Sequence, residues 1–397
     1  MSKTKKILPE LRFPEFENEG EWEEDMVYNL VFTITPPKKI TSSNYQKYGK
    51  FPIIDQSKNY YCGWTNDNEA VITEDLPLII FGDHTCVIKI AKKPFAQGAD
   101  GIKILKTKDK IFPEYLFHYL CHNEVVMEDY KRHYSILKDK VIVFPNINSG
   151  EQQRIASCLS SLDEVIEAHS KKLELLKDHK KGLLQNLFPQ DGEKVPKLRF
   201  KEFENSGEWE EKKLGEVGEI ITGNTPSTTN SENYNGSKLF VSPSDINENR
   251  YITQTQTTLS DIGFSKTRHI QANSVLFVCI GSTIGKVAQN KVECATNQQI
   301  NSIVPFSDYC SDFLFSVLEC FAKQIAELAG IQAVPIINKT QFSSIKLFFP
   351  KPKEQQKIAS CFSSLDEIIE AQAEKIEQLK LHKKGLMQGL FPKTIMN

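Results

Sequence analysis

Two stretches of the chain carry apolar residues in alternating steps of four and three, which makes a seven-residue repeat. This repeat predicts a long helix that packs along one side against another helix. At about 1.5 Å per residue, each helix would be a rod of roughly 55 Å. The seam of the first stretch, residues 151–189, runs through Ile155, Leu159, Leu162, Ile166, His169, Leu173, Leu176, Lys180, Leu183 and Leu187. The seam of the second, residues 354–392, runs through Ile358, Phe362, Leu365, Ile369, Gln372, Ile376, Leu379, Lys383, Leu386 and Leu390.

The two stretches are copies of each other, matching at 28 of 40 aligned positions (151–190 and 354–393). Because their seams match, each helix is the expected partner of the other. Two pairs of equivalent seam positions are polar, His169 with Gln372 and Lys180 with Lys383. Such residues can fix the register of a coiled coil, or they can reach past a loosened seam to water. The seam residues form no obvious charge pair, so the second interpretation is favoured.

The duplication extends beyond the helices. The stretch PELRFPEFENEGEWEE (9–24) returns as PKLRFKEFENSGEWEE (196–211), identical at 13 of 16 positions. The copies lie 187 residues apart here and 203 apart in the helices, so the second copy holds 16 more residues in its middle. We expect one globular domain at 1–150, a central helix at 151–190, a second globular domain at 191–350 and a distal helix at 351–397. The short link from 189 to 196 favours antiparallel helices and a pseudo-twofold relation between the halves.

The divergent middles read as mixed helix and strand. Two longer patterns predict helices at about 113–130 and 308–330, and the second ends at a glycine suited to a helix C-terminus. The expected fold class is therefore α/β (α+β), two globular domains joined by two long antiparallel coiled-coil helices. Apolar runs bounded by Gly, Asp, Asn and Pro predict strands at 51–55, 76–82, 86–91, 101–105, 141–145, 238–243, 274–280, 300–306 and 345–350.

Composition places the chain among soluble, multidomain proteins. Its 397 residues exceed one ordinary core, and 40% apolar with 25% charged residues is typical of globular proteins. No apolar run approaches the roughly 20 residues of a membrane span, and no apolar signal core follows the N-terminus, so a cytoplasmic location is expected. Nine cysteines without a C-x-x-C pair indicate reduced thiols.

Charge alone does not decide whether the chain binds nucleic acid. The net charge is −2, yet five lysines face one aspartate between residues 36 and 60. Phosphate binding needs a local patch, not a basic chain. The lysines fit such a patch and fit a solvated surface equally well.

Catalytic motifs are missing from the sequence. We find no Gly-rich methyltransferase loop, and the Thr-Pro-Pro-Lys stretch at 35–38 lacks the amide and the ring of an amino-methylation tetrad. GSTIGKV (281–287) has the wrong spacing for a phosphate loop and a valine where Ser or Thr should hold magnesium. His118, Cys121 and His122 lie at helical spacing, but no fourth ligand is evident, so packing is favoured over metal binding. No catalytic residue and no metal site are predicted.

The duplicated helices, EQQ(R/K)IAS…SLDE(V/I)IEA…HKKGL(L/M)Q…LFP, and the PxLRFxEFE…GEWEE leaders resemble the specificity subunit of type I restriction-modification enzymes. The resemblance covers the full length, and it is strong in the helices and weak in the middles. It implies two target-recognition domains, each reading one half of a split, asymmetric sequence in double-stranded DNA. The helix pair would set the unread spacer and dock two methyltransferase (modification) subunits, which bring S-adenosylmethionine. Restriction (translocase/nuclease) subunits would add ATP- and magnesium-dependent cleavage, while this chain would bind no cofactor and catalyse nothing.

The expected DNA contacts are loop residues that can hold phosphates or read base edges. The candidate contacts are Lys38, Lys39, Lys58, Asn59, His84, Thr85 and Lys103 in the first domain, and Asn224, Thr225, Ser244, Arg268, Ser282, Thr283, Lys286, Asn297, Gln298 and Gln299 in the second. For His84, in FGDHT, the alternative to a DNA contact is a plain turn after a strand.

A second hypothesis for the whole chain is an adaptor that does not bind DNA, with two protein-binding domains on an antiparallel coiled coil. It predicts no DNA sequence preference at any salt concentration.

Overall fold

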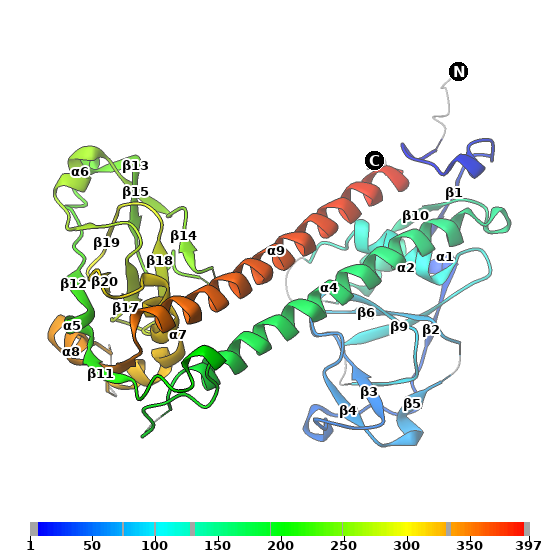
Figure 1. The fold of residues 1–397 in the computed structure, drawn as a ribbon. Helices are drawn as coiled ribbons and strands as arrows, with labels where there is room; N and C mark the ends of the chain where they lie inside the picture. The colour runs from blue at the N-terminus through cyan, green and yellow to red at the C-terminus, as the bar shows by residue number, and fades with distance from the viewer. Residues whose placement is uncertain are drawn as a thin grey trace. The chain divides into compact units, whose positions relative to one another are not determined.

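The computed structural model describes residues 7–73, 75–98, 101–127, 132–190, 192–247, 249–330 and 335–392. Its contacts divide the chain into two compact units. Unit 1 comprises Met1–His169 and Lys375–Asn397, and unit 2 comprises Ser170–Glu374. Each unit therefore takes one end of each long helix, together with one of the two globular domains (Figure 1).

Over the described residues, unit 1 holds two four-stranded sheets and a two-stranded ribbon. The helices of its globular part are α1 (Val27–Leu30), α2 (Pro113–His122) and α3 (Tyr134–Asp139), with 3-10 turns at Pro14–Phe16, Ser42–Asn44, Asn68–Ala70 and Ile147–Ser149. The first sheet has the order β2 (Val31–Ile34), β9 (Ile102–Thr107), β6 (Leu78–Gly82), β7 (Ile88–Ala91). The second has the order β4 (Gly63–Thr65), β3 (Phe51–Ile54), β8 (Phe95–Gln97), β5 (Val71–Ile72), and the ribbon pairs β1 (Glu23–Met26) with β10 (Val141–Phe144).

The described part of unit 2 repeats this plan with one strand more. Its short helices are α5 (Leu214–Val217), α6 (Asp261–Ser265), α7 (Ser311–Glu327) and α8 (Lys339–Ser344), with 3-10 turns at Lys201–Phe203 and Ser231–Asn233. The first sheet has the order β12 (Gly218–Thr222), β20 (Ile300–Pro305), β17 (Val275–Val278), β18 (Val287–Asn290), β14 (Tyr251–Ile252). The second has the order β15 (Thr257–Leu259), β13 (Tyr234–Val241), β19 (Cys294–Thr296), β16 (His269–Ile270), and β11 (Glu210–Lys213) pairs with β21 (Lys346–Phe349).

The strand orders show that one domain fold is used twice. In sequence order, β2, β3, β6 and β9 take the places of β12, β13, β17 and β20. Even the parallel pairing within each second sheet is repeated, β3 with β8 and β13 with β19. The extra edge strand β14 lies in the longer middle of the second half. The mixed helix and strand content predicted from the sequence is confirmed, and the two middles reach the same topology with little sequence in common.

Two predicted helices end earlier than expected. The helix predicted at 113–130 stops at His122, because Asn123 leaves the helical region with φ −106° and ψ 70°. The apolar run at 125–127 misled the prediction, since Val125 is buried but Val126 and Met127 are exposed; residues 128–130 lie outside the described residues. The helix predicted at 308–330 runs over Ser311–Glu327.

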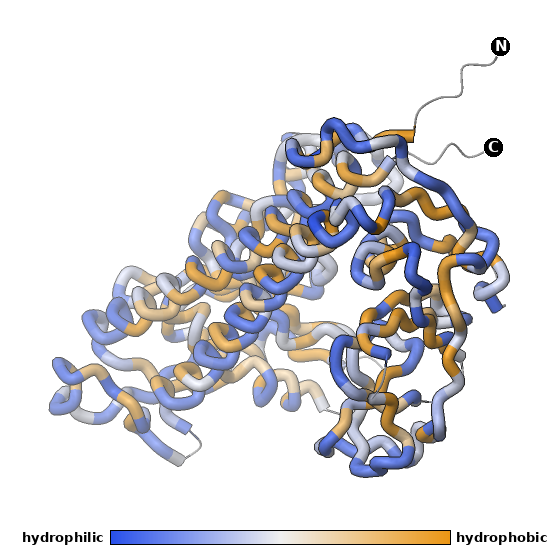
Figure 2. The backbone as a smooth tube through the Cα atoms, turned by 90° about the vertical axis from the view of Figure 1, so that its right-hand side faces the viewer, coloured by the Kyte–Doolittle hydropathy of each residue, from blue (hydrophilic) through white to orange (hydrophobic). Residues whose placement is uncertain are grey.

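The two long helices are present as α4 (Glu151–Leu187) and α9 (Pro352–Leu390). Helix α9 begins two residues before its repeat, at a proline, whose missing N–H costs nothing in the first turn. The apolar seam positions named above are buried or half-buried in both helices. Figure 2 shows hydrophobic and hydrophilic positions alternating along the helical turns.

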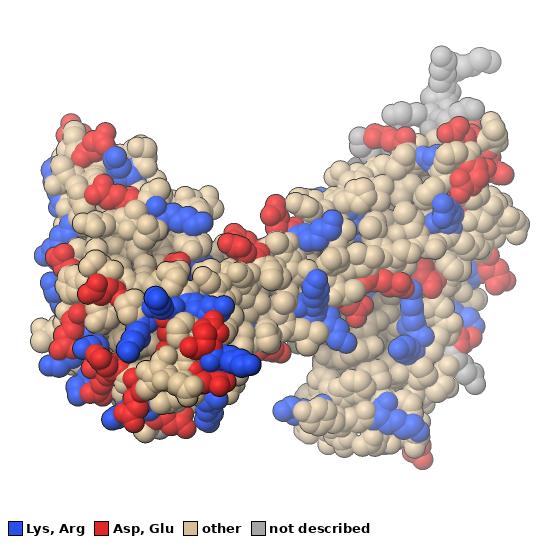
Figure 3. Space-filling model, viewed as in Figure 1, with Lys and Arg blue, Asp and Glu red and all other residues tan. Residues whose placement is uncertain are grey.

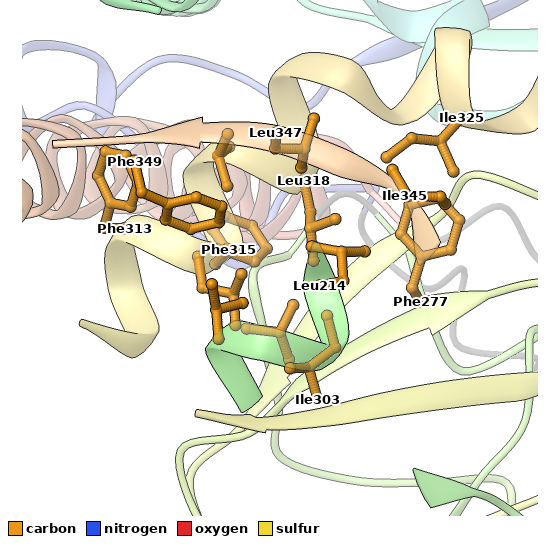
Figure 4. Packing of buried hydrophobic residues seen from close by; sticks show 14 of the residues in the cluster. Leu214, Phe277, Ile303, Phe313, Phe315, Leu318, Ile325, Ile345, Leu347 and Phe349 are labelled. Atoms are coloured by element: carbon orange, nitrogen blue, oxygen red, sulfur yellow. The ribbon is translucent and has the colours of Figure 1, made fainter. Parts of the chain in front are cut away.

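The repeated Leu-Phe-Pro at the end of each helix is built into a domain core. Leu187, the last residue of α4, and Phe188 pack in the core of unit 2 with Trp209. Leu390 and Phe391 occupy the same place in unit 1 with Trp22. Figure 4 shows side chains of α7, β21 and the central strands of unit 2 pointing toward one another in the larger core. The leader adds a main-chain bond in each unit, from Leu11 N to Gly389 O and from Leu198 N to Asn186 O, both 2.8 Å.

The repeated Leu-Arg-Phe and Glu-Gln-Gln sequences meet in a buried ion pair. Arg12 holds both carboxylate oxygens of Glu151, at 2.8 and 2.7 Å. Arg199 holds Glu354 in the same bidentate way, at 2.7 and 2.7 Å. Each ion pair fixes one of the two repeated leader segments, residues 9–24 or 196–211, to the first turn of a long helix. Packing within each unit therefore explains why the two copies keep these residues.

The first glutamine of Glu-Gln-Gln fastens the helix start to the domain. Gln152 accepts a hydrogen bond from Phe112 N at 2.7 Å and donates to Lys110 O and Pro145 O at 3.1 and 2.7 Å. Gln355 accepts from Cys310 N at 3.0 Å and donates to Pro350 O at 2.9 Å. Phe112 and Cys310 are the N-caps of α2 and α7. The same glutamine therefore holds the same corner of each domain.

The interpretation of the seam lysines as side chains reaching water was wrong. In unit 2, the Lys180 ammonium lies 2.8 Å from the Asp366 carboxylate on α9 and is only 14% exposed. In unit 1, Lys383 lies 2.5 Å from Asp163 on α4 and is 16% exposed. Both aspartates stand beside the seam rather than in it, which is why the seam positions alone did not reveal the pairing. In each unit the lysine of one long helix pairs with an aspartate of the other.

Candidate nucleic-acid interface

Unit 1 brings three of the predicted residues to one pocket of about 470 Å³. The pocket lies where β3 and β6 end and β9 begins, and Lys39 and Arg132 add two further chain segments to its lining. Hydrogen bonds hold its rim, from His84 N to Gln56 Oε1 at 3.3 Å and from Thr85 Oγ1 to Gln56 O at 2.7 Å. The lining residues are Lys39, Gln56, Asp83, His84, Gly101, Ile102, Lys103 and Arg132.

Sequence reasoning missed five of the eight residues that line this pocket, among them Arg132 and Gln56. Arg132 stands next to residues outside the described part of the chain, and only the fold brings it to the pocket that Lys103 lines. Gln56 follows a predicted strand directly, and that position could have marked it. Gly101 has φ +102°, and a Cβ there would lie 2.7 Å from Gln56 Nε2. The pocket therefore depends on glycine at 101.

A second pocket of about 510 Å³ shares Lys39 with the first. Lys38 also lines it, and its ammonium pairs with Asp67 at 2.6 Å. The hydrogen bond to that carboxylate raises the pKa of Lys38, which keeps the side chain charged. The other side chains are mostly amides and hydroxyls of the kind that hold or read nucleic acid, and the sequence reasoning did not select them: Thr41, Ser43, Asn44, Gln46, Thr65 and Asn66.

Lys58 and Asn59 lie apart from both pocket linings, in the loop after β3. Both are exposed. The buried side chain of Lys89 holds this loop in place, because its ammonium donates to Asp55 O at 2.8 Å and to Asn59 O at 2.6 Å. Burial lowers the pKa of Lys89. In the face that Figure 3 shows, the region of β3 to β5 carries several basic side chains and few acidic ones.

In unit 2, the predicted loops are bonded to one another. Thr225 Oγ1 donates to Gln298 Oε1 at 2.7 Å, which joins the loop after β12 to the loop after β19. Asn224 donates to Lys266 O at 3.0 Å and accepts from Arg268 N at 2.8 Å. Arg268 in turn donates to Thr222 O at 2.7 Å. Three loops far apart in the sequence therefore share one surface.

Several predicted residues in unit 2 are committed to internal bonds. Asn297 donates to Gln299 at 3.0 Å. The Lys286 ammonium donates to Ile246 O at 2.6 Å and Pro243 O at 3.2 Å. This lysine of the GSTIGKV stretch therefore ties two loops together and is half-buried. The exposed members are Thr225, Ser244, Arg268, Ser282 and Gln298, and Thr283 is half-buried.

The three residues weighed as metal ligands lie along α2. His118 is buried and its Nε2 bonds Ser160 Oγ at 3.0 Å. Burial lowers the pKa of His118 to about 3 and raises the pKa of Cys121 to about 12. Within the described residues, no group of three or more His, Cys, Asp or Glu side chains is arranged to hold a metal ion.

The long helices α4 and α9 carry charged residues throughout. Over the described ranges, none of the helices combines the length and the apolar character that crossing a bilayer requires.

Comparisons with known proteins agree on one family. A family model described as "Type I restriction modification DNA specificity domain" matches residues 21–178 and again residues 206–381. The specificity subunit of the type I restriction enzyme EcoR124I/EcoR124II from Escherichia coli is 25% identical over 385 residues, covering 90% of this chain and 92% of that protein. The HindI specificity subunit from Haemophilus influenzae is 35% identical over 163 residues, covering 39% of this chain and 35% of that protein.

The solved structures give the same fold. The crystal structure of the S subunit of a type I restriction-modification system from M. genitalium superposes with a TM-score of 0.67. It covers 98% of this chain and 100% of that one, at 15% identity. At that identity the likeness speaks for the fold alone.

Proposed function

The chain belongs to the family of type I restriction-modification DNA specificity domains, and on that premise we propose how its parts divide the reading of a DNA target. It is the DNA-recognition subunit of such a system, a non-catalytic member that assembles with other subunits. The comparisons give no support to the non-DNA adaptor.

Each globular domain reads one half of a split target. The observation that supports this best is a shared strand order combined with different loops. A common scaffold places the loops alike, while different loop residues read different bases. Unit 1 offers Lys39, His84, Lys103 and Arg132 around a pocket. Unit 2 offers exposed hydroxyl, amide and guanidinium groups on three joined loops. Two different half-sites make an asymmetric target, since palindromes require identical halves.

The long helices act as the ruler between the half-sites. They have 37 and 39 residues, which corresponds to about 55–60 Å of helix or roughly 16 base pairs. We propose that they pair antiparallel as a coiled coil. The contacts inside each unit support this, because the first half of one helix meets the second half of the other in both units. Inserting one heptad in each helix should lengthen the spacer by about three base pairs, from about 10.5 Å of added rise.

The helix pair also docks two methyltransferase subunits. These bring S-adenosylmethionine for adenine methylation, and restriction subunits add ATP- and magnesium-dependent translocation and cleavage. This chain binds none of these cofactors. The duplicated helices support two docking sites, because two nearly identical surfaces suit two copies of one partner.

The test is a genome-wide map of adenine methylation with and without this chain. Loss of one split, asymmetric motif on deletion is the expected result, and exchange of the two globular domains should reverse the order of the half-sites. An unchanged map, in cells where the methyltransferase is shown to be active, would refute the proposal.

A further inference from the structure

An aspartate at the same place in both repeats joins the two long helices. Asp163 and Asp366 are equivalent residues, 203 positions apart. In unit 1, both oxygens of Asp163 accept from Lys383 of α9, at 2.5 and 2.7 Å. In unit 2, Asp366 lies 2.8 Å from Lys180 of α4. The same charge pair is therefore formed twice, with the roles of the helices exchanged.

A serine one turn earlier joins each helix to its own recognition domain. Ser160 bonds His118 of α2 at 3.0 Å, and His118 Nδ1 lies 3.9 Å from the Asp163 carboxylate. In unit 2, the equivalent Ser363 accepts from Arg250 at 2.9 Å, and Arg250 also reaches Asp366 at 3.4 Å. Each Ser-x-x-Asp therefore touches three elements at one point, namely its own helix, the other helix and the recognition domain.

The domain side of the contact is built firmly in unit 2. Arg250 is 5% exposed and lies 2.5 Å from Asp312 of α7 and 2.6 Å from Gln289 of β18. Lys180 is shared as well, because Glu319 of α7 lies 2.8 Å from its ammonium. A charge held by several partners resists displacement in every direction, unlike a single surface ion pair.

These polar contacts remove an ambiguity that the apolar seam leaves. A seam with a seven-residue repeat matches itself again after a slide of seven residues. Asp163 and Lys180 are 17 positions apart (163 to 180), as are Asp366 and Lys383 (366 to 383), so one antiparallel register satisfies both pairs. A slide of seven residues in one direction would place Asp163 against Ile376 and Asp366 against Leu173. A slide of seven in the other direction would place Asp163 against Leu390 and Asp366 against Leu187.

Smaller slides are opposed in the same way. The apolar ends of the helices, Leu187–Phe188 and Leu390–Phe391, are held mainly by burial, which has little directional preference, with one main-chain bond beside each end. A charged hydrogen bond is lost when its atoms move by about an ångström. One base pair of spacer corresponds to about 3.4 Å along DNA, which is more than these bonds tolerate.

We propose that the two Ser-x-x-Asp nodes, Ser160 with Asp163 and Ser363 with Asp366, are positioning residues that restrict the subunit to one spacer length. The proposal rests on the proposed function. The nodes do not touch DNA, and they act by holding each recognition domain at one setting on the helix pair. Recognition of each half-site is left to the loops.

The test uses the whole chain with its methyltransferase in cells that carry plasmid targets. Each target holds both half-sites, with the native spacer or one changed by one or two base pairs. The variant is Asp163→Asn with Asp366→Asn. We expect methylation at off-length spacers, relative to the native spacer, to rise by about tenfold, the effect of losing a hydrogen-bonded charge pair, while the two half-sites stay the same.

A matched control is Asp75→Asn, which removes an exposed ion pair with Lys106 in the same unit. Asp75 has φ +62°, a conformation that asparagine also accepts. The control should keep the single spacer length. If the variant with both Asp163→Asn and Asp366→Asn keeps methylation at the native spacer and gains none at other spacer lengths, the proposal is overturned.

A charge exchange covers the case of a variant that does not fold. The Asp163→Lys variant should either methylate targets of every spacer length or methylate none. Adding Lys383→Asp to it should restore methylation that is limited to the native spacer. If the exchanged pair behaves no better than Asp163→Lys alone, the proposal is overturned. If the unaltered chain supports no methylation of any split target, the proposed function fails instead, which separates the two failures.

Discussion

The buried pair of Arg199 and Glu354 offers the sharpest test of how the leader holds its domain. Arg199 is 7% exposed and Glu354 is 1% exposed, so neither charge is screened by water. The guanidinium makes two bonds to the carboxylate at 2.7 Å and a third to Gly207 O at 2.7 Å. Arg199→Ala leaves the Glu354 carboxylate buried without its counter-charge. Breaking a buried pair in this way costs about 3–5 kcal/mol.

The position of the tryptophans lets the loss be assigned to one unit. The chain has three, Trp22, Trp64 and Trp209, and Trp209 belongs to unit 2, where it is buried against Phe188 and Phe313. In a background with phenylalanine at the first two positions, urea unfolding followed by fluorescence reports unit 2. We expect Arg199→Ala to lower the free energy of unfolding of unit 2 by about 3–5 kcal/mol.

Two further variants separate the causes. Arg199→Lys keeps the charge but loses the forked geometry, so its stability should lie between those of wild type and Arg199→Ala. Replacing both partners by methionine removes the stranded charge and should cost less than Arg199→Ala. A loss below about 1 kcal/mol for Arg199→Ala would place the pair with ordinary surface ion pairs and refute the argument.

Three single side chains give further predictions. Burial lowers the pKa of His118 from 6.5 to about 3, so the unfolded chain binds this proton at a higher pH than the folded chain does. Unit 1 should therefore lose stability as the pH falls below about 6.5, by up to about 1.4 kcal/mol per pH unit. His118→Asn should flatten this pH dependence in thermal melts taken from pH 7 to 5. Phe391→Ala should destabilise unit 1 by about 3–5 kcal/mol, because the ring packs against Tyr115 and Tyr119; denaturation of unit 2 should be unchanged, and equal loss in both units would contradict the division of cores. Lys58→Ala should lower the salt dependence of DNA binding by about one phosphate contact and leave the methylated motif the same; a changed motif would mean that this lysine reads a base.

Local periodicity predicted the long helices and nine of the 21 strands in the described residues, and the twelve strands that it missed are only two to five residues long. The seam residues repeat every seven positions, and runs such as 78–82 are apolar throughout because β6 is buried between two neighbours. Turn residues bounded the strands that were predicted. The end of α2 was missed, since Val125 continues an apolar pattern after the helix has stopped.

Contacts between distant residues were beyond the reach of local sequence patterns. Lys383 and Asp163 are 220 positions apart, and no local pattern signals that they meet. The same holds for Arg132 in the pocket with Lys39 and His84, which separate chain segments assemble. Polarity made Lys286 a candidate DNA contact, but only the structure shows its ammonium bonded to two carbonyl groups. The candidate contacts themselves stay predictions.

The placement of Phe391 in the core of unit 1 has a consequence for synthesis on the ribosome. Strand β10 of that domain ends at Phe144, and the ring that completes the core is made 247 residues later (144 to 391). At about 5–20 residues per second, the nascent domain waits roughly 12–50 s for its final side chain. A chain released early would therefore lack a finished first domain as well as its missing end. Such a fragment would expose apolar surface to chaperones and proteases.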